Sequence, residues 1–325
     1  MRETHIDARK LIRRSKLFVP VNRERFVSKA WTRGADCIIL DLEDAIAPGD
    51  KPSARKMVKD VIPIVNKGGA DIQVRINREF EQEDLDAIVI DGLTGVMIPK
   101  CESAEGIQRI DALVTQLEKE RALPEGKIHF DLIIETARGV VNVESIAMAS
   151  PRIVQVNLGQ TDLSVDMGFP RFLDLNFEQY FYAENRLLYA ARAANVQACG
   201  LGAQNDVDFT SVFMGQDAML KACRHAFWMG YMGAILIHPG WVDAANEGFT
   251  PPQSDLHLAR EVKIALDEAY ARGEGSVSVD GRMYDIANMK YVNYIVERAE
   301  AAARREAEKA AAVEAAGNIN KASPP

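Results

Sequence analysis

The chain has 325 residues and a mass of 35.9 kDa, and its 39 basic and 47 acidic side chains give a net charge of −8. Because a nucleic-acid-binding surface needs a basic face, this balance argues against a nucleic-acid partner. No stretch approaches the ~20 apolar residues of a membrane span, and the basic N-terminus lacks the apolar centre of a signal peptide. The four cysteines show no CxxC or zinc-ligand spacing. We therefore expect reduced thiols in a cytoplasmic protein without a membrane partner.

Short apolar runs alternate with longer helical patterns along the chain. Such runs are typical of strands buried in a parallel sheet, and they are Lys16–Val21, Cys37–Leu42, Ile72–Ile76, Gly95–Pro99, Phe130–Ile134, Ile153–Leu158 and Ala234–Ile237. A weaker run, Val196–Gly202, is the seventh if there are eight strands. The segments between them have an apolar spacing near 3.6 residues, which predicts helices over Arg23–Arg33, Ser53–Asn66, Ala104–Arg121, Val140–Ala149, Glu178–Ala194 and Ser211–Met229.

Eight strand–helix units over ~250 residues predict a TIM (β/α)8 barrel with a C-terminal helical extension. A doubly wound sheet is the main rival, but we find neither a GxGxxG nor a Walker-A sequence. The barrel is expected over residues 1–250 and the extension over 251–312. In the extension we expect helices over Ser254–Arg272 and Ile286–Ala312, joined by a turn-rich connector, Gly273–Asp280. Residues 313–325 are expected to form a flexible tail.

Polar residues gather where the expected strands end. In a barrel of this kind all the carboxyl ends of the strands meet on the face that carries catalysis. The residues in question are Asp41, Glu43, Asp44, Arg75, Asn77, Lys100, Glu135, Gly159, Gln160, Asp162 and His238. The chain order therefore predicts one cup that holds several carboxylates, an arginine and a lysine.

Each of these residues also has a structural interpretation. For Asp44 and Asp162, capping of the next helix is about as plausible as a functional role. Glu135 differs, because Thr136 is the better cap and a carboxylate after an apolar strand is costly unless it meets a cation. Glu135 and Asp162 together supply two oxygen donors, which suit Mg²⁺ or Mn²⁺. Arg75 could form a buried ion pair, but we expect it to point into the cup.

Several motifs in fixed order resemble one family. The motifs are LFVPVNRERF, GADCIILDLEDAIAPGDKPSAR, VRIN, GVMIPK, IIETARG, GQTDL, IHPGWVDAANEGFTP and DGRMYDIANMK. They are similar to motifs of the citrate lyase β-subunit-like family in the HpcH/HpaI aldolase superfamily. Within that family the similarity is greatest to malyl-CoA and citramalyl-CoA lyases. The likeness runs from about Lys16 to about Glu300.

The resemblance implies a TIM barrel assembled as a homotrimer or a homohexamer, with an acyl-CoA and a 2-oxo acid as substrates. It implies that Glu135 and Asp162 hold Mg²⁺ and that Arg75 contacts the substrate and the developing enolate. It implies that Asp285 reaches a neighbouring subunit's site as an acid/base. The acidic group near the metal corresponds to Asp41, Glu43 and Asp44, and the expected substrate- or CoA-binding residues are Asn22, Arg23, Arg25, Lys100, His238 and Pro239. From the residues alone, His238 is more simply interpreted as packed and hydrogen-bonded than as a base.

The chemistry of such a site is self-consistent. Cleavage of a carbon–carbon bond beside a thioester leaves an enolate and a 2-oxo acid, which a metal and a cation can stabilise. The leading hypothesis is a Mg²⁺-dependent lyase that splits malyl-CoA or citramalyl-CoA into acetyl-CoA (or propionyl-CoA) and glyoxylate or pyruvate. The alternatives are a malyl-CoA thioesterase, an aldolase acting on CoA-free 4-hydroxy-2-oxo acids, and a binding protein that has kept the fold. Val21 and Ala234 replace the family's usual Gly and Lys, and CGLGAQND replaces its usual Asp-Gly-Pro-like end of the seventh strand. These departures leave the acyl-CoA partner open.

Overall fold

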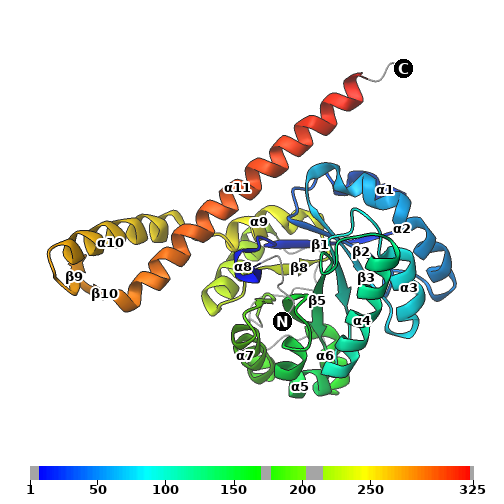
Figure 1. Ribbon diagram of the computed structural model, residues 1–325, viewed down its shortest axis with the longest axis horizontal. Coiled ribbons are helices and arrows are strands. Elements are labelled where there is room, and N and C mark those ends of the chain that lie inside the picture. Colours follow the sequence, from blue (N-terminus) through cyan, green and yellow to red (C-terminus); the bar gives the residue numbers. More distant parts are fainter. Residues whose placement is uncertain (1–6, 170–176, 203–214, 323–325) are drawn as a thin grey trace. The chain divides into compact units, whose positions relative to one another are not determined.

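The computed structural model describes residues 7–169, 177–202 and 215–322, and its centre is a sheet of eight parallel strands (Figure 1). In the sheet the strands follow the order β7-β6-β5-β4-β3-β2-β1-β8. The strands are β1 Ser15–Pro20, β2 Cys37–Asp41, β3 Asp71–Arg75, β4 Gly95–Ile98, β5 His129–Ile134, β6 Ile153–Leu158, β7 Gln197–Cys199 and β8 Ala234–Leu236. Seven expected strands are therefore confirmed to within about two residues, whereas the weakly marked run 196–202 shortens to three.

The sheet closes into a barrel at the seam between β7 and β8. Gly200 N donates a hydrogen bond to Gly233 O at 2.9 Å, and Met232 N donates one to Ala198 O at 2.8 Å. These two backbone bonds join the end of β7 to the residues just before β8. The expected TIM barrel is confirmed, because the strands are all parallel and follow the chain order around the barrel.

Helices surround the barrel in the positions that its strand–helix repeat requires (Figure 1). They are α1 Glu24–Ala30, α2 Lys51–Val65, α3 Glu81–Ile88, α4 Ala104–Glu120, α5 Ala137–Ala147, α6 Gln160–Asp166, α7 Phe177–Ala193, α8 Gln216–Met229 and α9 Val242–Gly248. The short helices α3, α6 and α9 were not expected, because seven or eight residues show too little of the helical period. The first residues of the helix expected over Ser211–Met229 lie outside the described chain.

The barrel interior holds a buried polar group and a small apolar cluster. Near the amino ends, the buried Lys16 Nζ donates to Asp131 Oδ2 at 2.8 Å and to Asn157 Oδ1 at 2.6 Å. A small apolar cluster shares the interior with these polar groups, and it is made of Cys37, Ile39, Met97 and Ile133 with the partly buried Phe18 and Ile235. The strand register pairs Lys16 with Cys37 and with Ile235, so polar and apolar side chains lie at the same level of the barrel.

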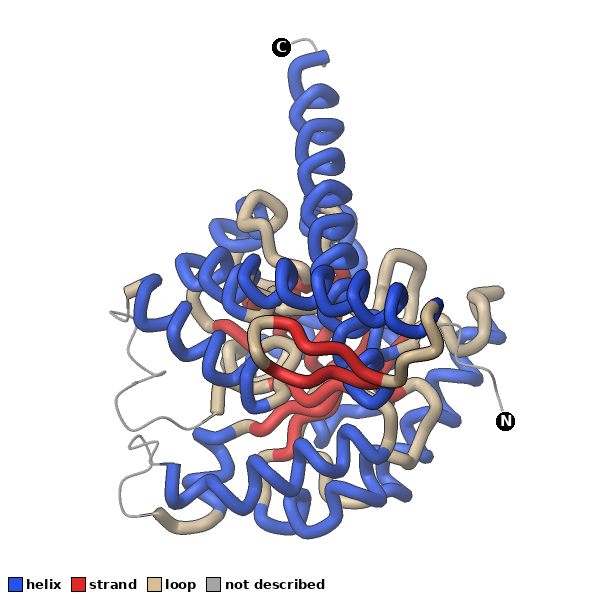
Figure 2. The backbone as a smooth tube through the Cα atoms, turned by 90° about the vertical axis from the view of Figure 1, so that its left-hand side faces the viewer, coloured by secondary structure: helices blue, strands red, loops and turns tan. Residues whose placement is uncertain are grey.

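A second compact unit comprises Thr250–Glu308, and the first comprises Met1–Phe249 with Lys309–Pro325. In the second unit, α10 Gln253–Ala271 packs against a hairpin of β9 Ser276–Val279 and β10 Arg282–Asp285 (Figure 2). We expected a turn-rich connector here, so that expectation was wrong. The reason is the dipeptide Asp280–Gly281, whose φ values of 50° and 74° fit the tight turn that right-twisted antiparallel strands prefer.

The last helix, α11 Ile286–Ala322, begins in the second unit and ends in the first. It runs ten residues beyond the expected end at Ala312, because its alanine- and glutamate-rich end has a high helix propensity. Within the first unit, the buried Lys309 Nζ lies 2.7 Å from Asp36 Oδ1. None of the described helices is both long enough and apolar enough to cross a membrane.

Candidate active site

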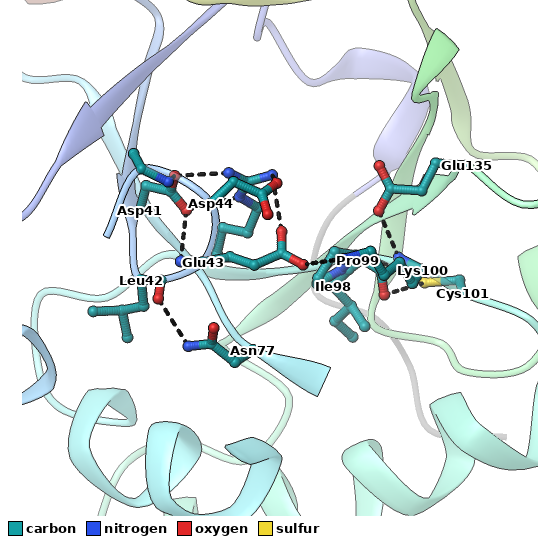
Figure 3. A network of polar contacts seen from close by, with 12 residues as sticks. Asp41, Leu42, Glu43, Asp44, Asn77, Ile98, Pro99, Lys100, Cys101 and Glu135 are labelled. Atoms are coloured by element: carbon teal, nitrogen blue, oxygen red, sulfur yellow. Dashed lines mark hydrogen bonds and ion pairs between the residues drawn. The ribbon is translucent and has the colours of Figure 1, made fainter. Parts of the chain in front are cut away.

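Arg75 is the centre of a cluster of carboxylates at the carboxyl ends of β2 and β3. Figure 3 shows the three carboxylates of the cluster, which belong to Asp41, Glu43 and Asp44. The parallel register places Asp41 beside Arg75, and its carboxylate accepts hydrogen bonds from Nε and Nη2, each at 2.7 Å. Nη1 lies 2.9 Å from Glu43 Oε2 and 3.1 Å from Asp44 Oδ2. The guanidinium therefore forms the buried ion pair that we had considered as the alternative, at the same face as the expected cup.

The electrostatics of this cluster keep Arg75 charged and disfavour the charged form of Glu43. Burial lowers the pKa of Arg75, but the hydrogen bonds and charge of Asp41 outweigh this effect and raise it above its usual value. Burial raises the pKa of Glu43, and the Arg75 charge opposes that rise. Arg75 is thus a permanent, buried cation that balances the buried Asp41 and Glu43 and the exposed Asp44.

The turn after β2 is held by its own polar groups. Asp41 accepts hydrogen bonds from Glu43 N at 3.0 Å and from Ala45 N at 3.1 Å. From the other side, Asn77 Nδ2 donates to Leu42 O at 2.8 Å. Asn77, which was expected in the cup, instead fixes the backbone that carries Glu43 and Asp44. These contacts explain why three acidic residues can project from one short turn.

Glu135 follows β5 and is only 3% exposed. Its Oε1 accepts a hydrogen bond from Lys100 N at 2.8 Å. Thr136 caps α5 by accepting from Gly139 N at 3.0 Å, as expected, so Glu135 is not used as a cap. Burial and the negative charge of Asp162 raise the pKa of Glu135 to about 8. Such a carboxylate is stabilised by a cation placed beside it.

Asp162 lies in the first turn of α6 and does not cap that helix, since Gly159 holds the capping position. Gly159 allows a close approach, because a Cβ there would come within 2.6 Å of Glu135 Cβ and Oε2. At the other end of α6, Asp166 accepts from Ala137 N at 2.7 Å, which ties α6 to the start of α5. The capping interpretation of Asp44 also fails, because Asp50 precedes α2.

The donor set fits a hard divalent cation. Within the described residues, no three His, Cys, Asp or Glu side chains gather as a metal site. Mg²⁺ does not need three, since it commonly takes one or two carboxylates and completes its shell with water and substrate. Glu135 and Asp162, which interact electrostatically, meet that requirement.

The remaining expected residues have simple contacts in the described chain. Asn22 lies in the turn after β1, Arg23 precedes α1, and the exposed Arg25 lies over the Phe26 ring. His238 Nδ1 accepts from Gly240 N at 3.1 Å, and its ring lies 5.5 Å from that of Trp241, so the packed, hydrogen-bonded interpretation is confirmed. Pro239 begins the short 3-10 helix Pro239–Trp241.

Asp285 belongs to the second unit and ends β10. Its Oδ1 accepts a hydrogen bond from Ala287 N at 2.9 Å, and its own N–H donates to Asn288 Oδ1 at 2.9 Å. Asp285 therefore stabilises the start of α11 by capping, which is a sufficient structural reason for an aspartate at this position.

Three contributions were missed by sequence reasoning. These are the hydrogen bond from the Lys100 N–H to Glu135, the space that Gly159 leaves beside Glu135, and the hydrogen bond from Asn77 to Leu42 O. A glycine directly before QTD and an asparagine directly after VRI were visible signals. Neither shows which neighbour it serves without the register of the strands.

A parallel barrel with carboxylates and a buried guanidinium at its carboxyl ends is the architecture of a TIM-barrel enzyme. Residues 14–239 match the model of the HpcH/HpaI aldolase/citrate lyase family, so the chain belongs to that family and is a carbon–carbon lyase. It is 34% identical to the citrate lyase subunit beta of Leuconostoc mesenteroides subsp. cremoris, over 84% of this chain and 89% of that protein. It is 35% identical to the L-malyl-CoA/beta-methylmalyl-CoA lyase of Cereibacter sphaeroides, over 88% and 94%.

Solved structures give the same fold. CitE from Mycobacterium tuberculosis, solved in complex with magnesium, acetoacetate and coenzyme A, aligns with a TM-score of 0.66 and 25% identity, over 90% of this chain and 99% of that chain. A citrate lyase from Burkholderia xenovorans aligns with a TM-score of 0.76 at 16% identity, over 91% and 95%, which supports the fold alone.

Proposed function

We propose that this protein is a Mg²⁺-dependent lyase that reversibly cleaves a 3-hydroxyacyl-CoA of the malyl-CoA or citramalyl-CoA type. The products are acetyl-CoA, or propionyl-CoA, and glyoxylate or pyruvate. The observation that carries the proposal is the chain of contacts that links Glu135 through Lys100 and Glu43 to Arg75 at one barrel face, with the charge of Asp162 acting on Glu135. The lyase names of the relatives, and the magnesium and coenzyme A in the CitE complex, support it.

Each residue has a role that follows from its chemistry. Glu135 and Asp162 would hold Mg²⁺, which supplies Lewis acidity toward the oxygens of a 2-oxo acid. Arg75 would stabilise the negative charge of the enolate oxygen, because it is a buried cation held in a fixed position. Asp41, Glu43 and Asp44 hold Arg75 in place and balance its charge.

Two further parts of the proposal concern binding and assembly. The residues that would contact the CoA moiety or the substrate follow strands β1 and β8. They are Asn22, Arg23 and Arg25 after β1, and His238 and Pro239 after β8. Asp285 would carry the proton of the acyl group in the site of a neighbouring subunit, in a homotrimer or homohexamer. The cysteines are all buried thiols, which suits a cytoplasmic protein.

The test is a panel of acyl-CoA and 2-oxo acid pairs, incubated with and without Mg²⁺ and followed by mass spectrometry in both directions. We expect Mg²⁺-dependent formation of a 3-hydroxyacyl-CoA and its cleavage back to the same pair. Release of CoA thiol without any 2-oxo acid would instead show a thioesterase. Turnover of 4-hydroxy-2-oxo acids with no effect of CoA would show an aldolase. Full activity in excess EDTA would contradict the metal requirement.

A further inference from the structure

Lys100 adopts a backbone conformation that few residues other than glycine tolerate. It directly follows Pro99 after β4, and its φ is 47°, in the left-handed region. Non-glycine residues in this region are uncommon, and they persist where the surrounding structure holds them in place. We therefore expect contacts around Lys100 that stabilise this backbone conformation.

The backbone is held on both sides of Lys100. On the near side, Ile98 of β4 pairs with Leu132 of β5. On the far side, Cys101 N donates a hydrogen bond to Ile133 O at 3.1 Å. The chain thus returns to β5 immediately after Lys100. The bend between Ile98 and Cys101, which are both attached to β5, is therefore made by Pro99 and Lys100 alone.

This bend directs two groups of Lys100 toward two different carboxylates (Figure 3). The N–H donates to Glu135 Oε1 at 2.8 Å, and the ammonium Nζ lies 3.0 Å from Glu43 Oε1. The other oxygen of Glu43 lies 2.9 Å from Arg75 Nη1. A continuous chain of contacts therefore runs from Glu135 through Lys100 and Glu43 to Arg75.

We infer that Lys100 is a positioning residue that sets the Glu135 carboxylate through its backbone N–H and the Glu43–Arg75 pair through its ammonium. The inference rests on the proposed function, since it gives Glu135 to the metal and Arg75 to the substrate. It replaces our expectation that Lys100 binds substrate or CoA. The ammonium is held by Glu43, a partner that is itself almost fully buried.

The two halves of this role can be separated by substitution. Lys100→Gly and Lys100→Asn remove the ammonium but readily adopt positive φ, so they keep the N–H aimed at Glu135. Lys100→Ala and Lys100→Val also remove the ammonium and resist positive φ, the β-branched valine most strongly. All four variants lose the same charge, and only the second pair strains the backbone.

The experiment measures Mg²⁺ binding by calorimetry on the full-length protein, together with kcat and KM for the acyl-CoA that the substrate panel identifies. We expect Lys100→Gly and Lys100→Asn to bind Mg²⁺ within a few-fold of the wild type, and Lys100→Ala and Lys100→Val to bind it about 10-fold or more weakly. Because all four release Glu43, all four should lose kcat with little change in the acyl-CoA KM. Thermal unfolding of each variant shows that it is folded, and Lys100→Ala remains informative if Lys100→Val does not fold.

Equal Mg²⁺ affinity in the glycine and alanine variants would overturn the backbone role. A raised acyl-CoA KM with unchanged kcat in Lys100→Gly would overturn the positioning role of the ammonium and restore substrate binding. A wild-type protein that binds no Mg²⁺ would refute the proposed function itself, which is a different result from either of these.

Discussion

The Arg75 guanidinium lies over the ring of Phe18, with its Cζ 4.5 Å from the ring centroid. Phe18 packs against the apolar cluster of the barrel interior, and Asp41 and Glu43 hold the guanidinium at its edges. The cation is therefore fixed by an aromatic face and by carboxylates. A site that holds its cation in advance of the reaction has little reorganisation to undergo when charge develops on the substrate.

This arrangement predicts that a positive charge at position 75 is not sufficient for activity without the hydrogen-bonding geometry of a guanidinium. Arg75→Lys keeps a positive charge but cannot form the paired hydrogen bonds to Asp41. We expect kcat to fall by about 100-fold or more, while Mg²⁺ affinity changes little. Phe18→Leu, which keeps an apolar side chain but removes the cation–π contact, should lower kcat much less. Steady-state kinetics with the exposed control Arg109→Lys provide the measurement, and wild-type kcat in Arg75→Lys would contradict the role.

Glu135→Gln and Asp162→Asn should each abolish the stabilisation of the protein by Mg²⁺. Both variants keep the size of the side chain and remove the charge that a hard cation requires. A ligand that binds only the folded state raises the melting temperature, so the measurement is thermal unfolding with and without Mg²⁺. Glu144→Gln, an exposed carboxylate on α5, is the matched control and should respond as the wild type does. A normal Mg²⁺ response in Glu135→Gln would reject the assignment.

Asp285 allows its capping role to be separated from its proposed chemical role. Asn and Ser accept the same hydrogen bond from Ala287 N, whereas Ala cannot. We expect Asp285→Asn and Asp285→Ser to lose turnover but to keep wild-type stability and Mg²⁺ binding. Asp285→Ala should lose turnover and also about 1 kcal/mol of stability. Activity retained in Asp285→Asn would show that Asp285 caps α11 and has no chemical role.

A mixing experiment tests whether the site is shared between subunits. Asp285→Asn and Arg75→Lys chains are each inactive by expectation, but a mixed oligomer would contain sites with both native residues. We expect activity to reappear after subunits exchange, as checked by mass spectrometry of the oligomers. If exchange is complete and activity stays absent, Asp285 does not act across a subunit boundary.

His129 should make stability depend on pH. Burial and the charge of Arg13 lower the pKa of His129 to about 4, from about 6.5 in the unfolded chain. Between these values the unfolded chain binds a proton that the folded chain does not, so the free energy of unfolding falls as pH drops from 6.5 to 4. The loss is up to about 3 kcal/mol. His129→Gln should flatten this part of the curve in urea titrations, whereas the exposed His257→Gln should not. Parallel curves for wild type and His129→Gln would exclude this origin.

Much of this protein follows from the sequence because its signals are local. Short β-branched runs indicate strands, and their number and order specify a barrel whose carboxyl ends share one face. That reasoning places Arg75 and Glu135 at the same end of the barrel and Thr136 as the cap of α5. The hairpin Ser276–Asp285 was missed although its Asp-Gly turn is also a local signal.

The tertiary structure alone decided which partners these residues meet. The parallel register sets Asp41 beside Arg75, and the absence of a side chain at Gly159 lets Glu135 lie against the start of α6. The left-handed backbone of Lys100 arises because its two sides are attached to β5. The sequence by itself determined the barrel and the residue types on its catalytic face, since these depend on periodicity. It did not determine the contacts among those residues, because each contact joins segments tens of residues apart whose distance is set only when the barrel closes.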